Sequence, residues 1–191
     1  VKAMSIVPIT MCGDKILRKK ASTVTEIDDN IVGIISDMFE TMRNANGVGL
    51  AANQIGLNKQ IFVVDVSPVE GYENYKPVAM INPTIISKSD ETISMEEGCL
   101  SIPELRADVI RPQGIDISFF DVNMKEHTIE ADALFARVIQ HEYDHIRGIL
   151  FIDYFDDEMK KRYKKHLEKI RKRKLDIDYP ISASTDYYLI K

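Results

Sequence analysis

Residues able to bind a metal stand together in one short motif, His141-Glu142-Tyr143-Asp144-His145. In an α-helix, two residues four positions apart lie only ~40° apart around the axis, so both imidazoles project from the same face. Two imidazoles at this spacing can hold one divalent ion, and Glu142 lies at the rim, where it can take a proton from water. The motif therefore predicts a metal-dependent hydrolase.

The helix that must position this motif is predicted by an apolar stripe. Leu134 and Val138 precede His141 at helical spacing, so the ligands emerge from a buried wall. The alternative is that the motif arose by chance on a solvent-exposed helix. It is weaker here, because burying two histidines and a carboxylate without partners would cost free energy. We expect this helix to cover about residues 132–147 and to end before Gly148, a residue type common just past a helix C-terminus.

A catalytic metal site needs a third protein ligand and one open position. The extended motif that supplies a third histidine fails here, because Phe151 occupies its position. Glu158 and Glu168 are poor candidates, since both lie in or near a strongly basic helix that we expect to face solvent. Cys99 is the best choice, because no other soft ligand is available. The other residues of ligand type are His127, His166 and Cys12, and we expect Cys12 to be simply buried.

Three segments resemble, in this order and at this spacing, the three motifs of peptide deformylases: 47–54 (GVGLAANQ), 97–101 (EGCLS) and 140–145 (QHEYDH). Weaker similarity covers most of the chain from residue 13 to about residue 151. The chain departs from the family's usual pattern at Asn53, where a proline commonly precedes the glutamine, and this change could loosen the loop. The resemblance implies hydrolysis of the N-terminal formyl group from formyl-methionyl nascent polypeptides, with release of formate.

The resemblance also assigns roles at the metal. It implies one divalent ion per chain, with water in the fourth position and three protein ligands, namely Cys99, His141 and His145. Glu142 would act as general base and then general acid, while the Gln54 amide and the backbone N–H of Leu100 would meet the charge on the formyl oxygen. Family members generally carry Fe²⁺ in the cell, and Zn²⁺, Ni²⁺ or Co²⁺ also suit two imidazoles and a thiolate.

Substrate binding is predicted on the same grounds. The backbone at Gly49 would pair with the substrate main chain as a strand does, whereas the simpler interpretation is that Gly47 and Gly49 only form a turn. Arg106 either faces the peptide or is an ordinary surface arginine. Four apolar side chains would line the pocket for the methionine side chain: Val48, Met95, Leu134 and Val138.

The remaining sequence predicts an α+β fold. A helix is expected at 31–42, where five apolar residues recur at helical spacing after Asp28 or Asp29 as N-cap. Short segments without intervening helices predict mostly antiparallel strands packed around the central metal-binding helix: 61–66, 78–82, 84–87, 107–110, 115–121 and 128–131. A last helix is expected at 157–174, and the tail at 175–191 predicts an edge strand.

The expected last helix is strongly basic. Residues 160–174 contain ten Lys or Arg and one acidic residue, a net charge of +9, whereas the rest of the chain carries −14. One interpretation is a solvated helix whose lysines only aid solubility. The alternative is that helix 157–174 docks the enzyme on the ribosome through sequence-independent phosphate contacts. We expect no sequence-specific nucleic acid and no membrane as partners.

Length and composition fit one domain across residues 1–191, with 45% hydrophobic and 29% charged residues. No stretch predicts a membrane span or a secretory signal, so a cytoplasmic protein of bacterial type is expected, and a mature organellar form is also compatible. Two functions compete with deformylation. One is a zinc peptidase that cuts internal amide bonds with a carboxylate as third ligand. The other is a binding protein whose metal, held by four protein ligands, only stabilises the fold.

Overall fold

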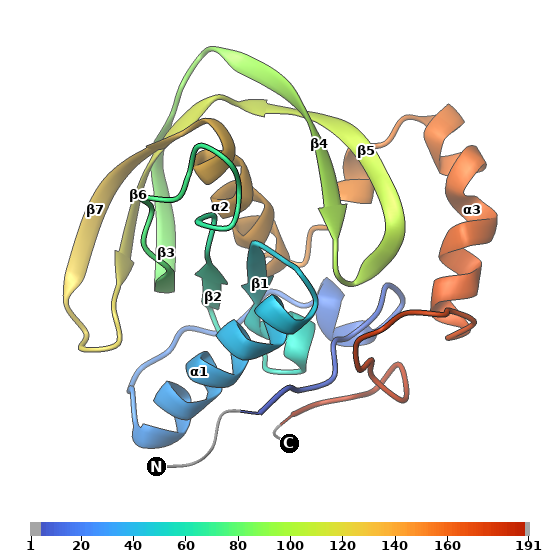
Figure 1. Ribbon diagram of the computed structural model, residues 1–191, viewed down its shortest axis with the longest axis horizontal. Coiled ribbons are helices and arrows are strands. Elements are labelled where there is room, and N and C mark those ends of the chain that lie inside the picture. Colours follow the sequence, from blue (N-terminus) through green and yellow to red (C-terminus); the bar gives the residue numbers. More distant parts are fainter. Residues whose placement is uncertain (1–4, 190–191) are drawn as a thin grey trace.

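The computed structural model describes residues 5–189, so residues 1–4 and the last two residues of the predicted tail lie outside the described part. Within it, two antiparallel sheets and three α-helices form the α+β fold predicted from the sequence (Figure 1). The larger sheet has the strand order β1-β2-β3-β6-β7, with β1 (Gly49–Ala51), β2 (Ile61–Val64), β3 (Val78–Lys88), β6 (Gly114–Phe120) and β7 (Glu126–Asp132). The smaller sheet pairs β4 (Thr92–Cys99) with β5 (Ile102–Pro112).

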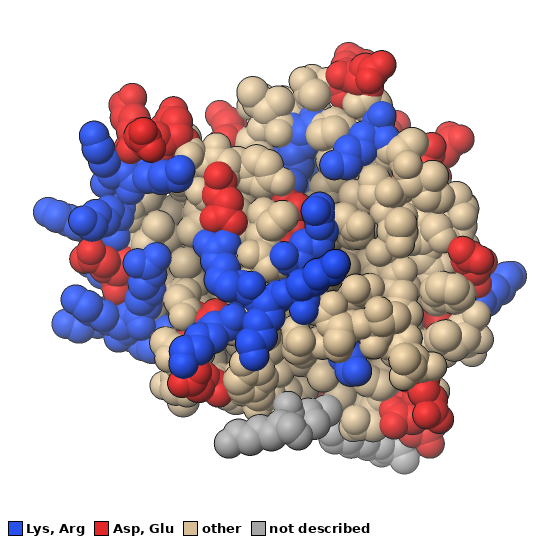
Figure 2. All heavy atoms as spheres, turned by 180° about the vertical axis from the view of Figure 1, so that it is seen from behind, with Lys and Arg blue, Asp and Glu red and all other residues tan. Residues whose placement is uncertain are grey.

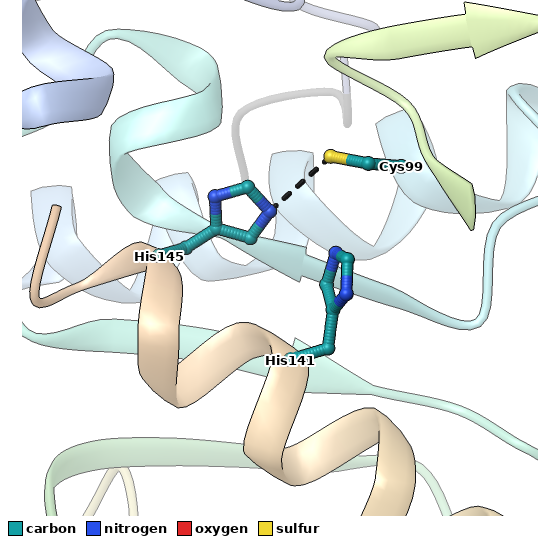
Figure 3. A group of neighbouring side chains, drawn as sticks. All are labelled: Cys99, His141 and His145. Carbon is teal, nitrogen blue, oxygen red and sulfur yellow. Dashed lines mark hydrogen bonds between the residues drawn. The ribbon is translucent and has the colours of Figure 1, made fainter. Parts of the chain in front are cut away.

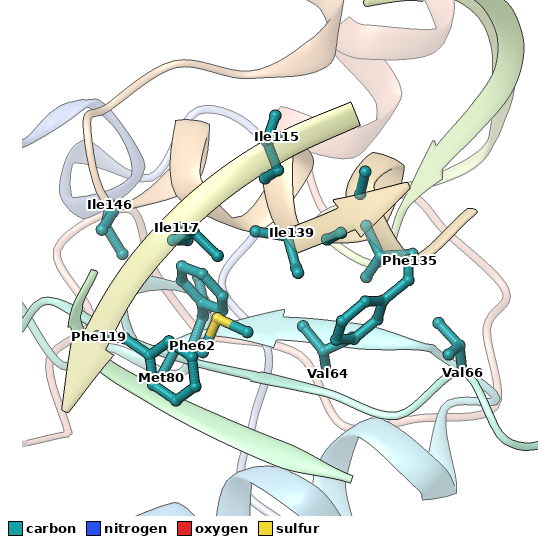
Figure 4. Close-up of a cluster of buried hydrophobic side chains, with 14 of the residues drawn as sticks. Phe62, Val64, Val66, Met80, Ile115, Ile117, Phe119, Phe135, Ile139 and Ile146 are labelled. Carbon is teal, nitrogen blue, oxygen red and sulfur yellow. The ribbon is translucent and has the colours of Figure 1, made fainter. Parts of the chain in front are cut away.

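Two helices, α1 (Asp29–Asn44) and α2 (Ala133–His145), pack on opposite faces of the larger sheet. Successive strand residues point to opposite faces, and in β2 both faces are buried. Phe62 and Val64 pack with α2, as Figure 4 shows, whereas Ile61 and Val63 belong to the core beneath α1. Ten of the 13 residues of α2 are buried, so most polar side chains on that helix depend on partners inside the protein.

The third helix, α3 (Asp157–Arg171), lies beside β5 and away from the larger sheet (Figure 1). It buries the predicted apolar seam in a third core, shared with β5 and the short 3₁₀ helices η1 (Lys15–Arg18) and η3 (Phe151–Tyr154). The seam consists of Met159, Tyr163, Leu167 and Ile170. The helix ends before the predicted residue 174, because Arg173 adopts a positive φ and turns its guanidinium back to Asp14 and Ser182.

The structure corrects several predicted boundaries. Segments 78–82 and 84–87 form the single strand β3, with a register shift between Ile81 and Thr84. Pro83 lacks an N–H donor and so interrupts the ladder without ending the strand. Strand β4 was not predicted, and the predicted segment 107–110 is only the middle of β5. The tail forms one isolated parallel bridge, Ile9 with Ile181, in place of an edge strand. Asp28 is the N-cap of α1, as expected.

Candidate metal centre

The three predicted ligands come together from two distant segments (Figure 3). His141 and His145 project from one face of α2, and Cys99 lies opposite them at the end of β4. Their donor atoms all lie within 4.8 Å of one another, and Cys99 Sγ is 3.3 Å from His145 Nε2. A thiolate and two imidazoles at these separations fit one divalent transition-metal ion with a further position left for water.

Other residues of ligand type are engaged elsewhere. His127 Nε2 lies 2.7 Å from a carboxylate oxygen of Asp121, and His166 Nε2 donates to the main-chain oxygen of Pro103 at 2.7 Å. Cys12 is buried in the third core. Among the residues that the structure describes, Cys99, His141 and His145 are therefore the one group of three that is arranged to bind a metal.

Glu142 lies buried beside the ligands and next to β1. Its carboxylate packs so closely on Gly49 that a Cβ at that position would overlap it. In the described part of the chain, Glu142 Oε2 has no hydrogen-bond partner. Burial raises the pKa of Glu142 to about 7, although the nearby charge of His141 acts against this. A carboxyl group with such a pKa can both take up and return a proton near neutral pH.

Gln54 is held in the 3₁₀ helix η2 (Ala52–Ile55) with its amide nitrogen toward the ligands. Its side-chain oxygen accepts a hydrogen bond from the backbone N–H of Ala51 at 2.9 Å. Its Nε2 lies 3.1 Å from Ser101 Oγ and 3.6 Å from Cys99 Sγ. Because the oxygen is occupied, the N–H groups are what this side chain offers to the site.

Asn53 ties the same segment to α2. Its Nδ2 donates to the main-chain oxygen of His145 at 2.5 Å, and its own main-chain oxygen accepts from Thr10 Oγ1 at 3.0 Å. Family members commonly have proline at this position. Here Asn53 connects η2, the helix of Gln54, to α2, the helix of His145. Whether this departure loosens the loop stays a prediction.

A cleft of about 750 Å³ opens over these groups. It is lined by nearly all the predicted site residues, namely Val48, Gly49, Gln54, Cys99, Leu100, Arg106, Leu134, Val138, His141 and Glu142. Arg106 is largely exposed and lies 3.5 Å from Glu96 at the mouth. Met95 is not among the described residues that line the cleft. It lies four residues before Cys99 along β4, about 13 Å at the rise of an extended strand, so its predicted pocket contact has no support.

The model of the polypeptide deformylase family matches residues 6–161 of this chain. The chain belongs to this family. A peptide deformylase of Prosthecochloris aestuarii is 45% identical over 177 residues, 93% of this chain and 95% of the relative. One of Cytophaga hutchinsonii is 46% identical over 176 residues, 91% of this chain and 95% of the relative.

Solved deformylase structures share the fold. One from Legionella pneumophila superposes with a TM-score of 0.82 at 32% identity, covering 91% of this chain and all of that one. One from Ehrlichia chaffeensis, in complex with actinonin, gives a TM-score of 0.81 at 38% identity, covering 91% of this chain and 100% of that one. Family members remove N-terminal formyl groups from nascent polypeptides, so this chain is a metallohydrolase of that activity, as the sequence predicted.

The deformylase centre is backed by a buried cluster of charges around Glu97. One oxygen of Glu97 lies 2.9 Å from His141 Nδ1, and the carboxylate also accepts from Arg111 at 2.6 Å and from Arg137 at 2.7 Å. Arg111 donates in turn to Asp144 at 2.6 Å. Burial opposes ionisation of Glu97, but its bonds to His141 and Arg111 hold its pKa well below the usual range. A carboxylate on Nδ1 leaves Nε2 of His141 free to bind a metal.

Sequence reasoning missed this cluster, although two of its members carried a signal. Glu97 lies inside the second motif, and Arg137 lies four residues before His141 on the same face of α2. Arg111 could have been found only with the pairing of β4 and β5, because it reaches Glu97 across the two strands.

Proposed function

We propose that Cys99, His141 and His145 hold one divalent ion at which the formyl amide of a nascent polypeptide is hydrolysed to formate and a free amine. The observation that carries this proposal is the convergence of three donor atoms beside the unpaired, buried carboxylate of Glu142. A divalent ion supplies Lewis acidity there and lowers the pKa of water from its ordinary value toward ~7.

Glu142 moves the proton in this proposal. It accepts a proton from the attacking water while the water oxygen bonds to the formyl carbon. It then returns the proton to the departing nitrogen as the carbon–nitrogen bond breaks. Its raised pKa and its position beside the ligands support both steps.

Two N–H donors meet the charge that develops on the formyl oxygen. Gln54 Nε2 faces the ligands because its carbonyl oxygen is already bonded to Ala51. Leu100 follows the ligand Cys99 directly, which places its backbone N–H at the same end of the cleft. Donors fixed before the reaction stabilise a developing oxyanion without having to reorganise.

The substrate main chain extends the larger sheet at β1. This strand is at the edge of the sheet, and its outer side has no strand partner among the described residues. Gly49 lies on β1 and lines the cleft, so a peptide bound there can pair with its backbone. The apolar side chains of Val48, Leu134 and Val138 supply the wall for the methionine side chain.

A formyl-methionyl peptide with internal amide bonds distinguishes this function from that of a zinc peptidase. The proposal predicts release of one formate per peptide and one new N-terminus, at methionine. Mass spectrometry that finds internal cleavage without formate would instead support the peptidase.

Fe²⁺ is proposed as the ion in the cell, because the family resemblance implies it and the donor set suits it. Metal analysis of protein purified without oxygen should find iron, with Zn²⁺, Ni²⁺ or Co²⁺ as functional replacements. Peroxide should inactivate the ferrous enzyme faster than the zinc enzyme, because a thiolate beside a redox-active ion is readily oxidised. Equal sensitivity of the two forms would count against Cys99 as a ligand.

The basic surface of α3 supports a second proposal, docking on the ribosome in the cytoplasm. Lys and Arg side chains gather along the edge of the molecule formed by α3, as Figure 2 shows. The lysines opposite the apolar seam are exposed, including Lys161, Lys165 and Lys172. Arg173 is not part of this surface, because its guanidinium is bonded to Asp14 and Ser182.

Charge reversal tests the docking. Changing Lys161, Lys165 and Lys172 to glutamate should weaken cosedimentation with ribosomes, and the wild-type binding should fall steeply as salt rises. The matched control reverses three exposed lysines elsewhere, Lys76, Lys88 and Lys125, and has the same net charge. Equal binding by both variants would leave α3 as a solvated element.

A further inference from the structure

The C-terminal segment 175–189 follows the part of the chain that the family model matches and folds back over the N-terminal region (Figure 1). Ile9 N donates to the main-chain oxygen of Pro180 at 2.9 Å, and Ser182 N donates to that of Ile9 at 2.8 Å. The side chain of Ser182 is buried and donates to the carboxylate of Asp14, which is 1% exposed. These bonds fix the middle of the segment.

From this anchor the segment reaches the active-site cleft on one side. Ile177 and Tyr179 line the cleft together with the ligand Cys99. The hydroxyl of Tyr179 donates to the main-chain oxygen of Leu100 at 2.7 Å. Burial raises the pKa of Tyr179, so its hydroxyl keeps its proton. Tyr179 therefore bonds directly to the residue that follows the cysteine ligand.

On the other side the segment contacts the helix that carries Gln54. The backbone N–H of Leu189 donates to the main-chain oxygen of Gly56 at 3.0 Å. Gly56 ends η2 with a φ of 83°, and a Cβ there would overlap Leu189 and the ring of Tyr187. One segment thus touches the two places from which the proposed oxyanion donors come.

We propose that segment 175–189 is a strap that completes the active site, and that Tyr179 is a positioning residue which fixes the Leu100 main chain. The proposal rests on the function proposed above, in which Leu100 donates its N–H and Cys99 binds the ion. The pairing of β4 with β5 shifts register between Gly98 and Cys99, just before the short turn, so regular strand pairing does not continue up to the turn. The Tyr179 hydroxyl supplies a fixed bond at that irregular point.

Removal of the single hydroxyl tests this role in the full-length enzyme. Tyr179→Phe keeps the ring and should lower kcat for a short formyl-methionyl peptide by about 3- to 10-fold. This is the rate effect expected from the loss of roughly one hydrogen bond that positions the Leu100 main chain. KM should change less than about twofold, since substrate and product contacts remain. Tyr75→Phe is the matched control, because Tyr75 is exposed and lies outside both the strap and the cleft lining. It should leave kcat unchanged.

Amide hydrogen exchange separates positioning from general stability and does not depend on activity. In Tyr179→Phe, exchange should rise at residues 99–102 and stay unchanged in the pairing of β6 with β7. A uniform rise would show a purely stabilising tyrosine and overturn the proposal, as would exchange and kcat equal to those of Tyr75→Phe. If wild-type protein released no formate, the proposed function would be refuted. The hydrogen-exchange result would still decide whether Tyr179 fixes the main chain at residues 99–102.

Discussion

Charged side chains are arranged in opposite ways around Glu97 and along α3. Around Glu97 they are buried and paired, with Arg111 and Arg137 at 5% and 3% exposure. Along α3 the lysines are exposed, and no ion pair among the described residues includes one of them. Removing one member of a buried ion pair lowers the free energy of unfolding by about 3–5 kcal/mol, because the remaining charge is buried without a partner. An exposed ion pair contributes only about 0–1 kcal/mol to that free energy.

This difference separates the buried charges behind the candidate metal ligands from the exposed charges that we propose to mediate docking. The buried cluster determines where His141 points, so a change there should reach the metal. Under the docking proposal, the exposed lysines of α3 act through their long-range field, and changing them should leave the catalytic atoms in place.

The largest effect is expected at Glu142. Glu142→Ala should keep its metal and lose about 10²–10⁴-fold in kcat, the usual contribution of a general base. Glu158→Ala, on the exposed surface of α3, is the control and should retain full kcat and metal. Steady-state formate release with metal analysis measures both. Loss of metal from the Glu158 variant would revive the carboxylate-ligand alternative.

A somewhat smaller effect is expected at Gln54. Gln54→Ala removes a donor aimed at the formyl oxygen and should lower kcat by about 10²–10³-fold with metal content unchanged. Gln60→Ala is a suitable comparison, because Gln60 donates to the main-chain oxygen of Ala21 away from the cleft. A change confined to KM would make Gln54 a residue that binds substrate without stabilising the transition state.

The Glu97 cluster should respond in metal affinity and in stability. Glu97→Gln should weaken metal binding by about 10–100-fold, as losses behind a ligating histidine do. It should also lower the free energy of unfolding by about 3–5 kcal/mol, because two arginines lose their buried counter-charge. Its exposed neighbour offers the control, and Glu96→Gln should match wild type in a chelator competition and a urea titration. Equal metal affinity and equal stability of the Glu97 and Glu96 variants would contradict the difference between buried and exposed charges.

The smallest effect is expected on α3. The triple glutamate variant at Lys161, Lys165 and Lys172 should hydrolyse a short formyl-methionyl peptide at the wild-type rate. Its free energy of unfolding should stay within about 0.5 kcal/mol per substitution, the ordinary range for surface changes. A drop in kcat for the short peptide would show that α3 also supports the active site.

The sequence predicted the candidate ligand group because helical spacing and short motifs are local properties. His141 and His145 follow from the period of the helix, and the α+β class follows from strands without crossover helices. The partners of Glu97 and the contact between Tyr179 and Leu100 join residues 14 to 79 positions apart, so they depend on the strand register and on the path of the tail. Met95 was predicted to line the pocket from the family resemblance alone, and it is not among the described residues that line the cleft.

Whether the Cys99 thiolate binds the catalytic ion can be decided by comparing Cys99→Ala with Cys12→Ala. Cys12 is the other free cysteine, and it is buried in the third core, against which Cys99 also packs, without being one of the three grouped donors. Metal content after anaerobic purification, measured with formate release on the same samples, decides the question. We expect Cys99→Ala to lose both metal and activity, while Cys12→Ala keeps both. Stoichiometric metal and normal turnover in Cys99→Ala would contradict this expectation.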